Sequence, residues 1–272
     1  FLLVLRRIRL AIIATLQTVL GPATEPFGDL RRAFRVISNH SWCMTDTYRE
    51  LAGLPRRGDA LVEGEEHWQQ VAGGERGFIV VTAHVGHWEV GSRIQRPGRE
   101  RTLHVVREPE IDPESQRFLE GLLRRRAGET TRFHFVSDDP SVGIRLLAAL
   151  RRGDIVALQG DRPSAAGRTA IVELFGRSFE MPVGPAALAR SAGVPLFPIF
   201  VFRNRDGGST LVFRPPIEVP RSGSRKADLE AATAEVARQV EWAIRRDPYQ
   251  WFCFRRVWPD HSEARVAGEA EA

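Results

Sequence analysis

Short apolar runs alternate with stretches of helical periodicity along the chain from about residue 77. Apolar runs rich in β-branched and aromatic residues occur at 77–83, 102–106, 132–136, 154–159, 169–175, 195–202 and 210–213. Helical patterns occupy 87–94, 113–126, 141–152 and 184–192, and a last one covers 226–246, before Pro248. Several runs are apolar on consecutive residues, as in strands covered on both faces. The alternation predicts βαβ units, and therefore an α/β fold with a mostly parallel sheet flanked by helices.

The first 55 residues predict two helices, of which the first ends at Gly21 and the second at Gly53. One apolar stripe follows the first helix and consists of Val4, Leu5, Ile8, Ile12, Leu16 and Val19. Three arginines interrupt the apolar run, so it is too broken for a spanning helix of about 20 apolar residues. A basic, one-sided helix favours the head-group layer of an anionic membrane, and packing of the stripe on its own domain is the alternative.

These patterns divide the chain into three parts. Residues 1–55 form a helical N-terminal extension with a membrane-surface contact, and residues 56–260 form the α/β domain. Residues 261–272 are polar and rich in small side chains, which predicts a flexible tail.

The charge of the chain favours anionic partners. The sequence has 39 Lys and Arg against 34 Asp and Glu, a net charge of +5, and its pI is about 10.1. No helix-turn-helix, zinc or base-stacking signature accompanies this charge, so we expect no nucleic acid partner. Cys43 and Cys253 are far apart and match no zinc spacing, which indicates a reducing compartment and no disulfide framework.

The candidate chemistry follows the run at 77–83, which leads into His84-Val85-Gly86-His87-Trp88-Glu89. Ligands of parallel α/β sheets bind at the carboxyl ends of the strands, where His84 would lie. Gly86 permits a tight turn, and Glu89 falls in the first turn of the next predicted helix. This spacing lets the Glu89 carboxylate orient one imidazole nitrogen and leaves the other free to accept a proton. We therefore predict a general base, His84, with Glu89 as its partner.

Other chemistries have weaker support. A lone His-x4-Glu is more often incidental than catalytic, and it gains weight here from its place at a strand end. The sequence contains no Gly-x-Ser-x-Gly elbow, phosphate-binding loop or dinucleotide-binding glycine motif. His84, His87 and Glu89, joined by His104 and Asp161, could gather around a metal, but their spacing differs from the usual helical zinc motif. We expect neither a metal nor a cofactor.

Several ordered segments resemble the bacterial lipid A acyltransferases and phosphatidylinositol mannoside acyltransferases, within the glycerolipid acyltransferases marked by His-x4-Asp/Glu. HVGHWE is similar to their first block, and VVREPE, with Arg107, to their second. LQGDRP, with Asp161 and Arg162, is similar to the third. The later matches are LFGRSFEMPVGPAALARSAGVPLFPIF and DPYQWFCFRRVWP. The resemblance covers about residues 30–259, although His87 stands where the family usually has Asn.

The resemblance implies transfer of a fatty acyl group from acyl-carrier protein or acyl-CoA to a hydroxyl of a membrane glycolipid. It also implies the cytoplasmic face of the bacterial plasma membrane, with peripheral or N-terminally anchored attachment. His84 would take the hydroxyl proton, and Glu89 would stabilise the imidazolium. Among binding residues, Arg107 and Arg162 would hold phosphate, Asp161 acceptor hydroxyls, and backbone N–H groups near Gly86 the oxyanion. Glu173 is a further substrate-binding candidate, although a carboxylate in such a strand is more often a polar edge residue.

Two rival functions remain open. One is a peripheral membrane-binding protein without catalysis, and the other is a thioester or ester hydrolase that uses the same site. Trp251 and Trp258 also have two interpretations, since they could lie at a lipid interface or lock the C-terminal segment onto the domain.

Overall fold

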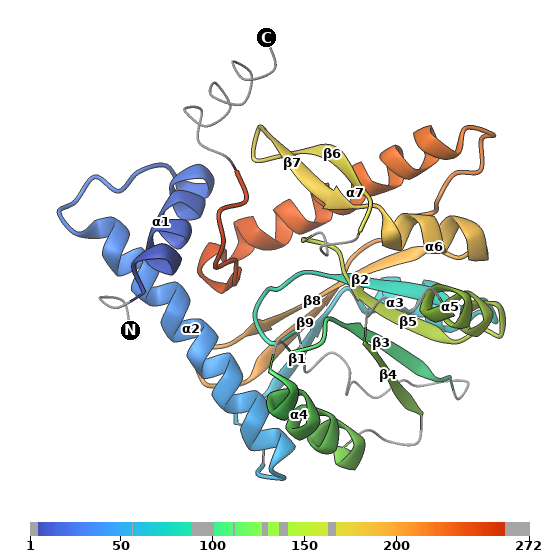
Figure 1. Cartoon of the computed structure of the whole chain (residues 1–272), viewed down its shortest axis with the longest axis horizontal. Coiled ribbons are helices and arrows are strands. Elements are labelled where there is room, and N and C mark those ends of the chain that lie inside the picture. Colours follow the sequence, from blue (N-terminus) through green and yellow to red (C-terminus); the bar gives the residue numbers. More distant parts are fainter. Residues whose placement is uncertain are drawn as a thin grey trace.

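The computed structural model describes residues 5–55, 57–88, 101–110, 112–126, 130–135, 141–162 and 167–258 (Figure 1). Its helices are α1 (Arg6–Leu20), α2 (Gly28–Leu51), α3 (Glu65–Ala72), α4 (Pro113–Arg126), α5 (Ser141–Arg151), α6 (Gly184–Ala192), α7 (Arg225–Arg246) and the 3-10 helix η2 (Pro248–Gln250). Its strands are β1 (Ala60–Glu63), β2 (Phe78–Thr82), β3 (Leu103–Arg107), β4 (Thr131–Phe135), β5 (Ile155–Gln159), β6 (Thr169–Leu174), β7 (Arg177–Pro182), β8 (Leu196–Arg203) and β9 (Ser209–Phe213).

The main sheet has seven strands in the order β1-β9-β8-β2-β5-β3-β4. Strands β8, β2, β5, β3 and β4 run parallel to one another, and β9 is antiparallel to β8 but parallel to β1. The predicted α/β fold with a mostly parallel sheet is therefore confirmed, and β2 lies at its centre.

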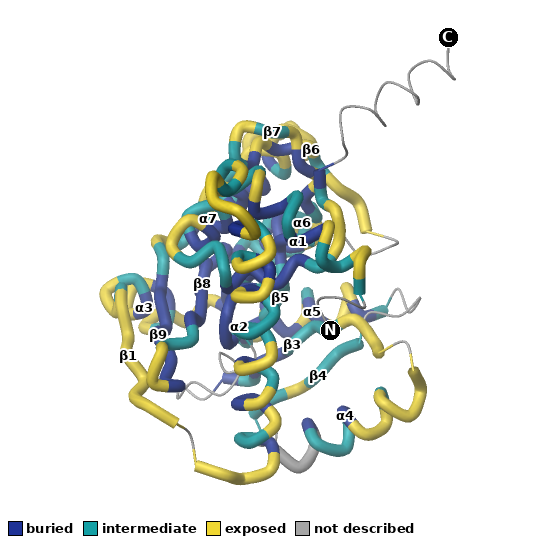
Figure 2. The backbone as a smooth tube through the Cα atoms, turned by 90° about the vertical axis from the view of Figure 1, so that its left-hand side faces the viewer, coloured by how far each residue is buried: buried dark blue, intermediate teal, exposed yellow. Residues whose placement is uncertain are grey.

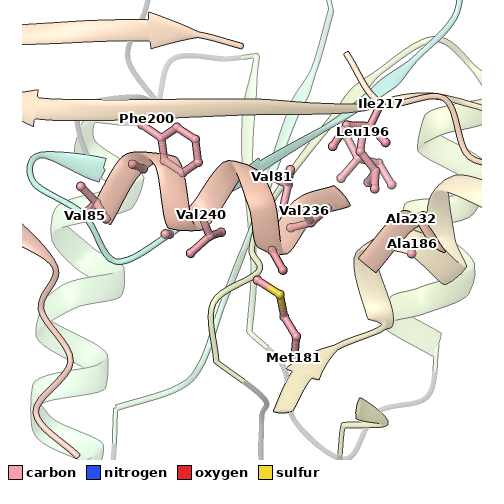
Figure 3. Packing of buried hydrophobic residues seen from close by; sticks show 14 of the residues in the cluster. Val81, Val85, Met181, Ala186, Leu196, Phe200, Ile217, Ala232, Val236 and Val240 are labelled. Atoms are coloured by element: carbon pink, nitrogen blue, oxygen red, sulfur yellow. The ribbon is translucent and has the colours of Figure 1, made fainter. Parts of the chain in front are cut away.

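Alternation along β2 divides the core into two layers, because successive side chains of a strand point to opposite faces. Ile79 and Val81 join a cluster with the buried sides of α5, α6 and α7. Figure 3 shows this packing, with Val236 and Val240 of α7 beside Val81. Phe78 points to the other face, where the ring of Trp68 from α3 meets it edge-on at 6.1 Å. The burial pattern in Figure 2 agrees, since the central strands are buried and the periphery is exposed.

The run at 169–175 was expected to form a strand of the main sheet, but the structure places it elsewhere. As β6 it pairs antiparallel with β7 in a separate two-stranded sheet over α7 (Figure 1). Phe175 and Gly176 form the turn with φ of 54° and 70°. The sequence pattern did not indicate β7, β1 or α3. Of these, β1 has only four residues, all of them exposed.

The apolar stripe of α1 packs inside the molecule. Ile12 and Leu16 are buried against Ala33 and Val36 of α2 and against Phe252 of the C-terminal segment. The expectation that this stripe faces a membrane is therefore wrong for Ile12 and Leu16, because α2 and the C-terminal segment already cover them.

No helix within the described part of the chain combines the length and apolar character that crossing a membrane requires. The two N-terminal helices are confirmed, whereas the proposed division at residue 55 stays a prediction, and residues 261–272 lie outside the described residues.

Candidate functional site

The site forms where β2 and β5 end side by side. These parallel strands pair Phe78 with Ile155 and Thr82 with Gln159, so the sequence separation between paired residues is the same at both ends of the strands. His84 and Asp161 each lie two residues beyond the last paired position, so the same register brings them together. This is the carboxyl edge of the sheet, where α/β proteins bind ligands.

Asp161 orients His84 through a direct contact between side chains. His84 Nδ1 lies 2.7 Å from Asp161 Oδ1, and the backbone N–H of His84 donates to Oδ2 at 3.2 Å. The indole N–H of Trp251 also donates to Oδ2, at 3.0 Å. The Asp161 side chain is 0% exposed and that of His84 is 23% exposed. The imidazole is therefore held from inside the protein and reaches solvent on its other side.

Charge keeps Asp161 ionised although it is buried. Burial alone would raise the pKa of this carboxyl, but His84, Arg162 and the Trp251 N–H outweigh burial and hold the pKa well below its usual range. An ionised Asp161 can only accept, so Nδ1 of His84 carries the proton between them. Arg162 Nε lies 3.1 Å from the same Nδ1. Since a protonated Nδ1 has no lone pair for that donor, Arg162 contributes positive charge here rather than a hydrogen bond.

Trp88 links His84 to Arg107, which ends β3 on the far side of β5. The imidazole meets the Trp88 ring edge-on with centroids 5.7 Å apart, and the Arg107 guanidinium carbon lies 5.5 Å from the centre of that ring. The structure therefore brings together four predicted positions: His84, Arg107, Asp161 and Arg162. They follow three adjacent strands, β2, β5 and β3.

The loop after β2 is fixed by the C-terminal segment. The Gly86 N–H donates to the Gln250 carbonyl at 2.9 Å, and the Phe252 N–H donates to the His84 carbonyl at 2.9 Å. The N–H of His87 donates to Val201 at 2.8 Å. The expectation that backbone N–H groups near Gly86 serve an oxyanion site is thus corrected for Gly86 and His87, since both groups already have acceptors within the protein.

Gly86 instead permits close packing, which leads to a testable prediction. Its φ is +56°, and a Cβ there would lie 2.3 Å from the Val201 carbonyl oxygen and 2.7 Å from Gln250 Oε1. We expect Gly86→Ala to lower the free energy of unfolding by about 3 kcal/mol, from backbone strain together with the clash. Urea denaturation measures this change.

Gly176 provides the matched control for this substitution. Its φ is +70°, but a Cβ there meets nothing within 4 Å. Gly176→Ala should lower the free energy of unfolding by only about 1–2 kcal/mol, because the left-handed backbone conformation disfavours a Cβ. An equal loss in both variants would contradict the packing role of Gly86.

The remaining predicted residues lie elsewhere. Glu173 is exposed on β6, in the small sheet that is separate from β2 and β5, so the structure does not bring it to this site. His87 is buried, with Nδ1 2.8 Å from the Ser209 hydroxyl, and His104 Nδ1 lies 2.9 Å from His134 Nε2. Within the described part of the chain, no three potential ligands gather as a metal site. Glu89 lies outside the described residues, so its pairing with His84 stays a prediction.

Two contributions were missed by sequence reasoning. Asp161 was expected to bind acceptor hydroxyls, but its oxygens are buried and taken by His84 and Trp251, which corrects that assignment. Trp251 and Trp258 are buried, so the lipid-interface interpretation is wrong and their role is internal. The available signal was the Gln-Trp pair near the C-terminus, for which the sequence alone indicated no partner.

The fold and the site define a class of protein: an α/β protein with a histidine–aspartate pair at the carboxyl edge of a mostly parallel sheet. The chain belongs to the bacterial lipid A biosynthesis acyltransferases, since the family model matches residues 42–259. This match confirms the resemblance seen in the sequence.

Phosphatidylinositol mannoside acyltransferases are among the similar proteins. The one from Mycobacterium tuberculosis is 28% identical over 236 residues, covering 82% of this chain and 67% of the relative. That of Mycolicibacterium smegmatis is 26% identical over 265 residues, with coverages of 90% and 78%. The solved structure of the 1-acyl-sn-glycerophosphate acyltransferase PlsC from Thermotoga maritima covers 86% of this chain and 95% of its own. The TM-score of that match is 0.39, at 15% sequence identity.

Proposed function

We propose that this acyltransferase moves a fatty acyl chain from an acyl thioester to a hydroxyl of a membrane glycolipid, with His84 as the general base. The observation that supports the base most directly is the 2.7 Å contact between Nδ1 of His84 and buried Asp161. It fixes the proton on Nδ1 and leaves the lone pair on Nε2 for a substrate. The named relatives favour a phosphatidylinositol mannoside as acceptor.

The proposed reaction needs one proton carrier and no covalent acyl-enzyme. Nε2 of His84 takes the proton of the acceptor hydroxyl as the oxygen attacks the thioester carbonyl carbon. The carbon–sulfur bond then breaks, and the imidazolium returns the proton to the thiolate, which gives an ester and a free thiol. Asp161 stays ionised and stabilises the imidazolium. Proton transfer by a positioned base such as His84 typically raises the rate about 10²–10⁴-fold.

The arginines beside this pair suit anionic substrate groups. Arg162 and Arg107 follow adjacent strands at the same edge as His84. A guanidinium binds phosphate through charge-assisted hydrogen bonds, so we assign both to phosphate groups of the donor or acceptor. Glu89 keeps its assignment as a partner of His84 only as the alternative to Asp161, because Asp161 already holds Nδ1 and a carboxylate on Nε2 would block the lone pair that the reaction needs.

An assay of product formation tests this function. The purified chain is incubated with labelled acyl-carrier protein or acyl-CoA and either phosphatidylinositol mannosides or a lipid A precursor, and products are identified by mass spectrometry. Acylated glycolipid supports the proposal and identifies the donor. Release of free fatty acid without acylated glycolipid would instead show a hydrolase, and absence of both would contradict catalysis.

We also propose that α2, rather than the stripe of α1, contacts the membrane surface. Leu30 and Phe34 are exposed and lie four residues apart, so they share one face at the N-terminal end of α2, and the exposed Phe27 is the residue just before the helix. Arg31 and Arg35 are exposed on the same two turns. Apolar side chains flanked by arginines match a surface of anionic lipid, where rings enter the interface and guanidiniums meet phosphates.

Phe34→Ser tests this contact. Phe34 is 59% exposed and supports no buried cluster, so its loss should leave stability unchanged while weakening binding to phosphatidylglycerol vesicles about tenfold. Sedimentation of the protein with vesicles measures the binding.

Ile144→Ser is the control, since Ile144 is 70% exposed but lies on α5. Equal losses from both variants would contradict a specific role for α2.

A further inference from the structure

A polar cavity of about 310 Å³ lies between α1, the β6–β7 turn and the C-terminal segment. Thr15, Gln17 and Thr18 of α1 form one wall, and Arg177 and Arg256 form others. Figure 1 shows the three segments converging above the N-terminal half of α2. Segments far apart in the sequence therefore build this space together.

The cavity is lined by positive charge. Its described lining includes two arginines and no Asp or Glu. The Arg177 guanidinium donates to the Thr18 hydroxyl at 3.2 Å, which fixes its direction along the wall. Carboxylates next to lining residues are already engaged: Asp29 accepts from Gln17 at 2.6 Å, and Glu241 bonds to Arg245 and to the N–H of Phe175. The geometry thus favours an anion.

The ring of Trp258 forms part of this lining. The residue is only 6% exposed and its indole N–H is itself buried, so the ring contributes a wall rather than a donor that a ligand can reach. The donors for a ligand are the two guanidiniums, which bind phosphate oxygens through charge-assisted hydrogen bonds.

The cavity is also close to the catalytic pair. The rings of Trp258 and Trp251 meet edge-on at 6.0 Å, and Trp251 donates to Asp161. Trp258, which lines the cavity, is thus linked through Trp251 to the Asp161 carboxylate that holds His84. A phosphate group bound there would lie on the same substrate whose hydroxyl or thioester reacts.

We propose that this cavity binds a phosphate group of one of the two substrates, as an anion subsite separate from Arg107 and Arg162. The inference rests on the proposed acyl transfer for its substrates, but the binding itself does not require turnover. The phosphate could belong to the phosphodiester of the acceptor or to the pantetheine phosphate of the donor. Both have the chemistry that the cavity recognises.

Calorimetric titration of the full chain tests the proposal with two probes, glycerophosphoinositol for the acceptor and coenzyme A for the donor. Arg256→Gln should weaken binding of at least one probe about tenfold, the effect expected for losing a charge-assisted hydrogen bond. Arg255→Gln, the neighbouring arginine outside the cavity lining, should change binding less than about twofold.

Each outcome bears on the subsite. Loss for glycerophosphoinositol alone assigns it to the acceptor, and loss for coenzyme A alone assigns it to the donor. Absence of binding to the unmodified chain, no effect of Arg256→Gln, or an equal effect of Arg255→Gln overturns the proposal. Failure of the proposed function is distinguishable, because it would remove acyl transfer from the unmodified chain and leave these titrations unchanged.

Discussion

His84→Asn should lower the rate of glycolipid acylation by about 10²–10⁴-fold, the contribution of positioned proton transfer. The Asn amide nitrogen can take the place of Nδ1 and donate to Asp161, which otherwise would be left as a buried, unpaired carboxylate. The second imidazole nitrogen has no counterpart in Asn. The variant therefore removes the proposed base while retaining the contact that supports the fold, and initial rates measured under saturating donor report the loss.

His84→Ala provides a useful comparison, because it removes both the base and the partner of Asp161. It should lose turnover to the same extent and also unfold at lower urea concentration. His67→Asn is the control, since His67 lies on α3 and takes no part in the site. More than about a tenth of the original rate in His84→Asn would exclude His84 as the base, because general-base removal costs at least about 10²-fold.

The sequence predicts strands well where burial is complete and poorly where an edge is exposed. β2 and β5 carry consecutive apolar residues, because helices cover the sheet on one face and α3 packs on the other. β1 has only four residues, all exposed, so its Ala-Leu-Val run is too short to indicate a strand. The stripe of α1 shows the same limit, since periodicity reveals that one face is apolar but not what covers it.

Most residues of the site could be predicted from the sequence, but the contacts between them could not. His84, Arg107, Asp161 and Arg162 each follow an apolar run, and parallel strands end at a common edge. Which strands are neighbours depends on tertiary packing, so the pairing of His84 with Asp161 could not be read from the spacing of residues 77 apart. Glu89, separated from His84 by four residues, was the only carboxylate that local spacing could offer.

Asp161→Asn should lower turnover by about 10³–10⁴-fold, although it preserves size and shape. Oδ2 of Asp161 accepts two hydrogen bonds, from Trp251 and from the His84 backbone, so the Asn oxygen will take that place. Its NH₂ group then faces His84 Nδ1 and forces that nitrogen to accept. The imidazole proton moves to Nε2, which can no longer take a proton from the substrate. Steady-state rates at neutral pH measure the loss.

The same substitution has a pH-dependent effect on stability. The pKa of Asp161 is held well below its usual range, so the folded state favours the ionised form. Such a group stabilises the fold fully above its unfolded pKa of about 3.9, and the contribution is lost as the pH falls below that value. Urea unfolding should therefore show Asp161→Asn less stable by about 3 kcal/mol at pH 7, with a smaller difference at pH 3.

Comparison with Glu89→Gln decides which carboxylate orients His84. If Asp161 does so, Asp161→Asn lowers turnover far more than Glu89→Gln. Only for Asp161→Asn does the difference in unfolding free energy from the unmodified chain become smaller at low pH. If Glu89→Gln abolishes turnover while Asp161→Asn retains it, the orienting carboxylate is Glu89, and the buried Asp161 serves the fold. Since Nδ1 and Nε2 cannot both be held by carboxylates while one accepts a substrate proton, the two variants should not have equal effects on the chemical step.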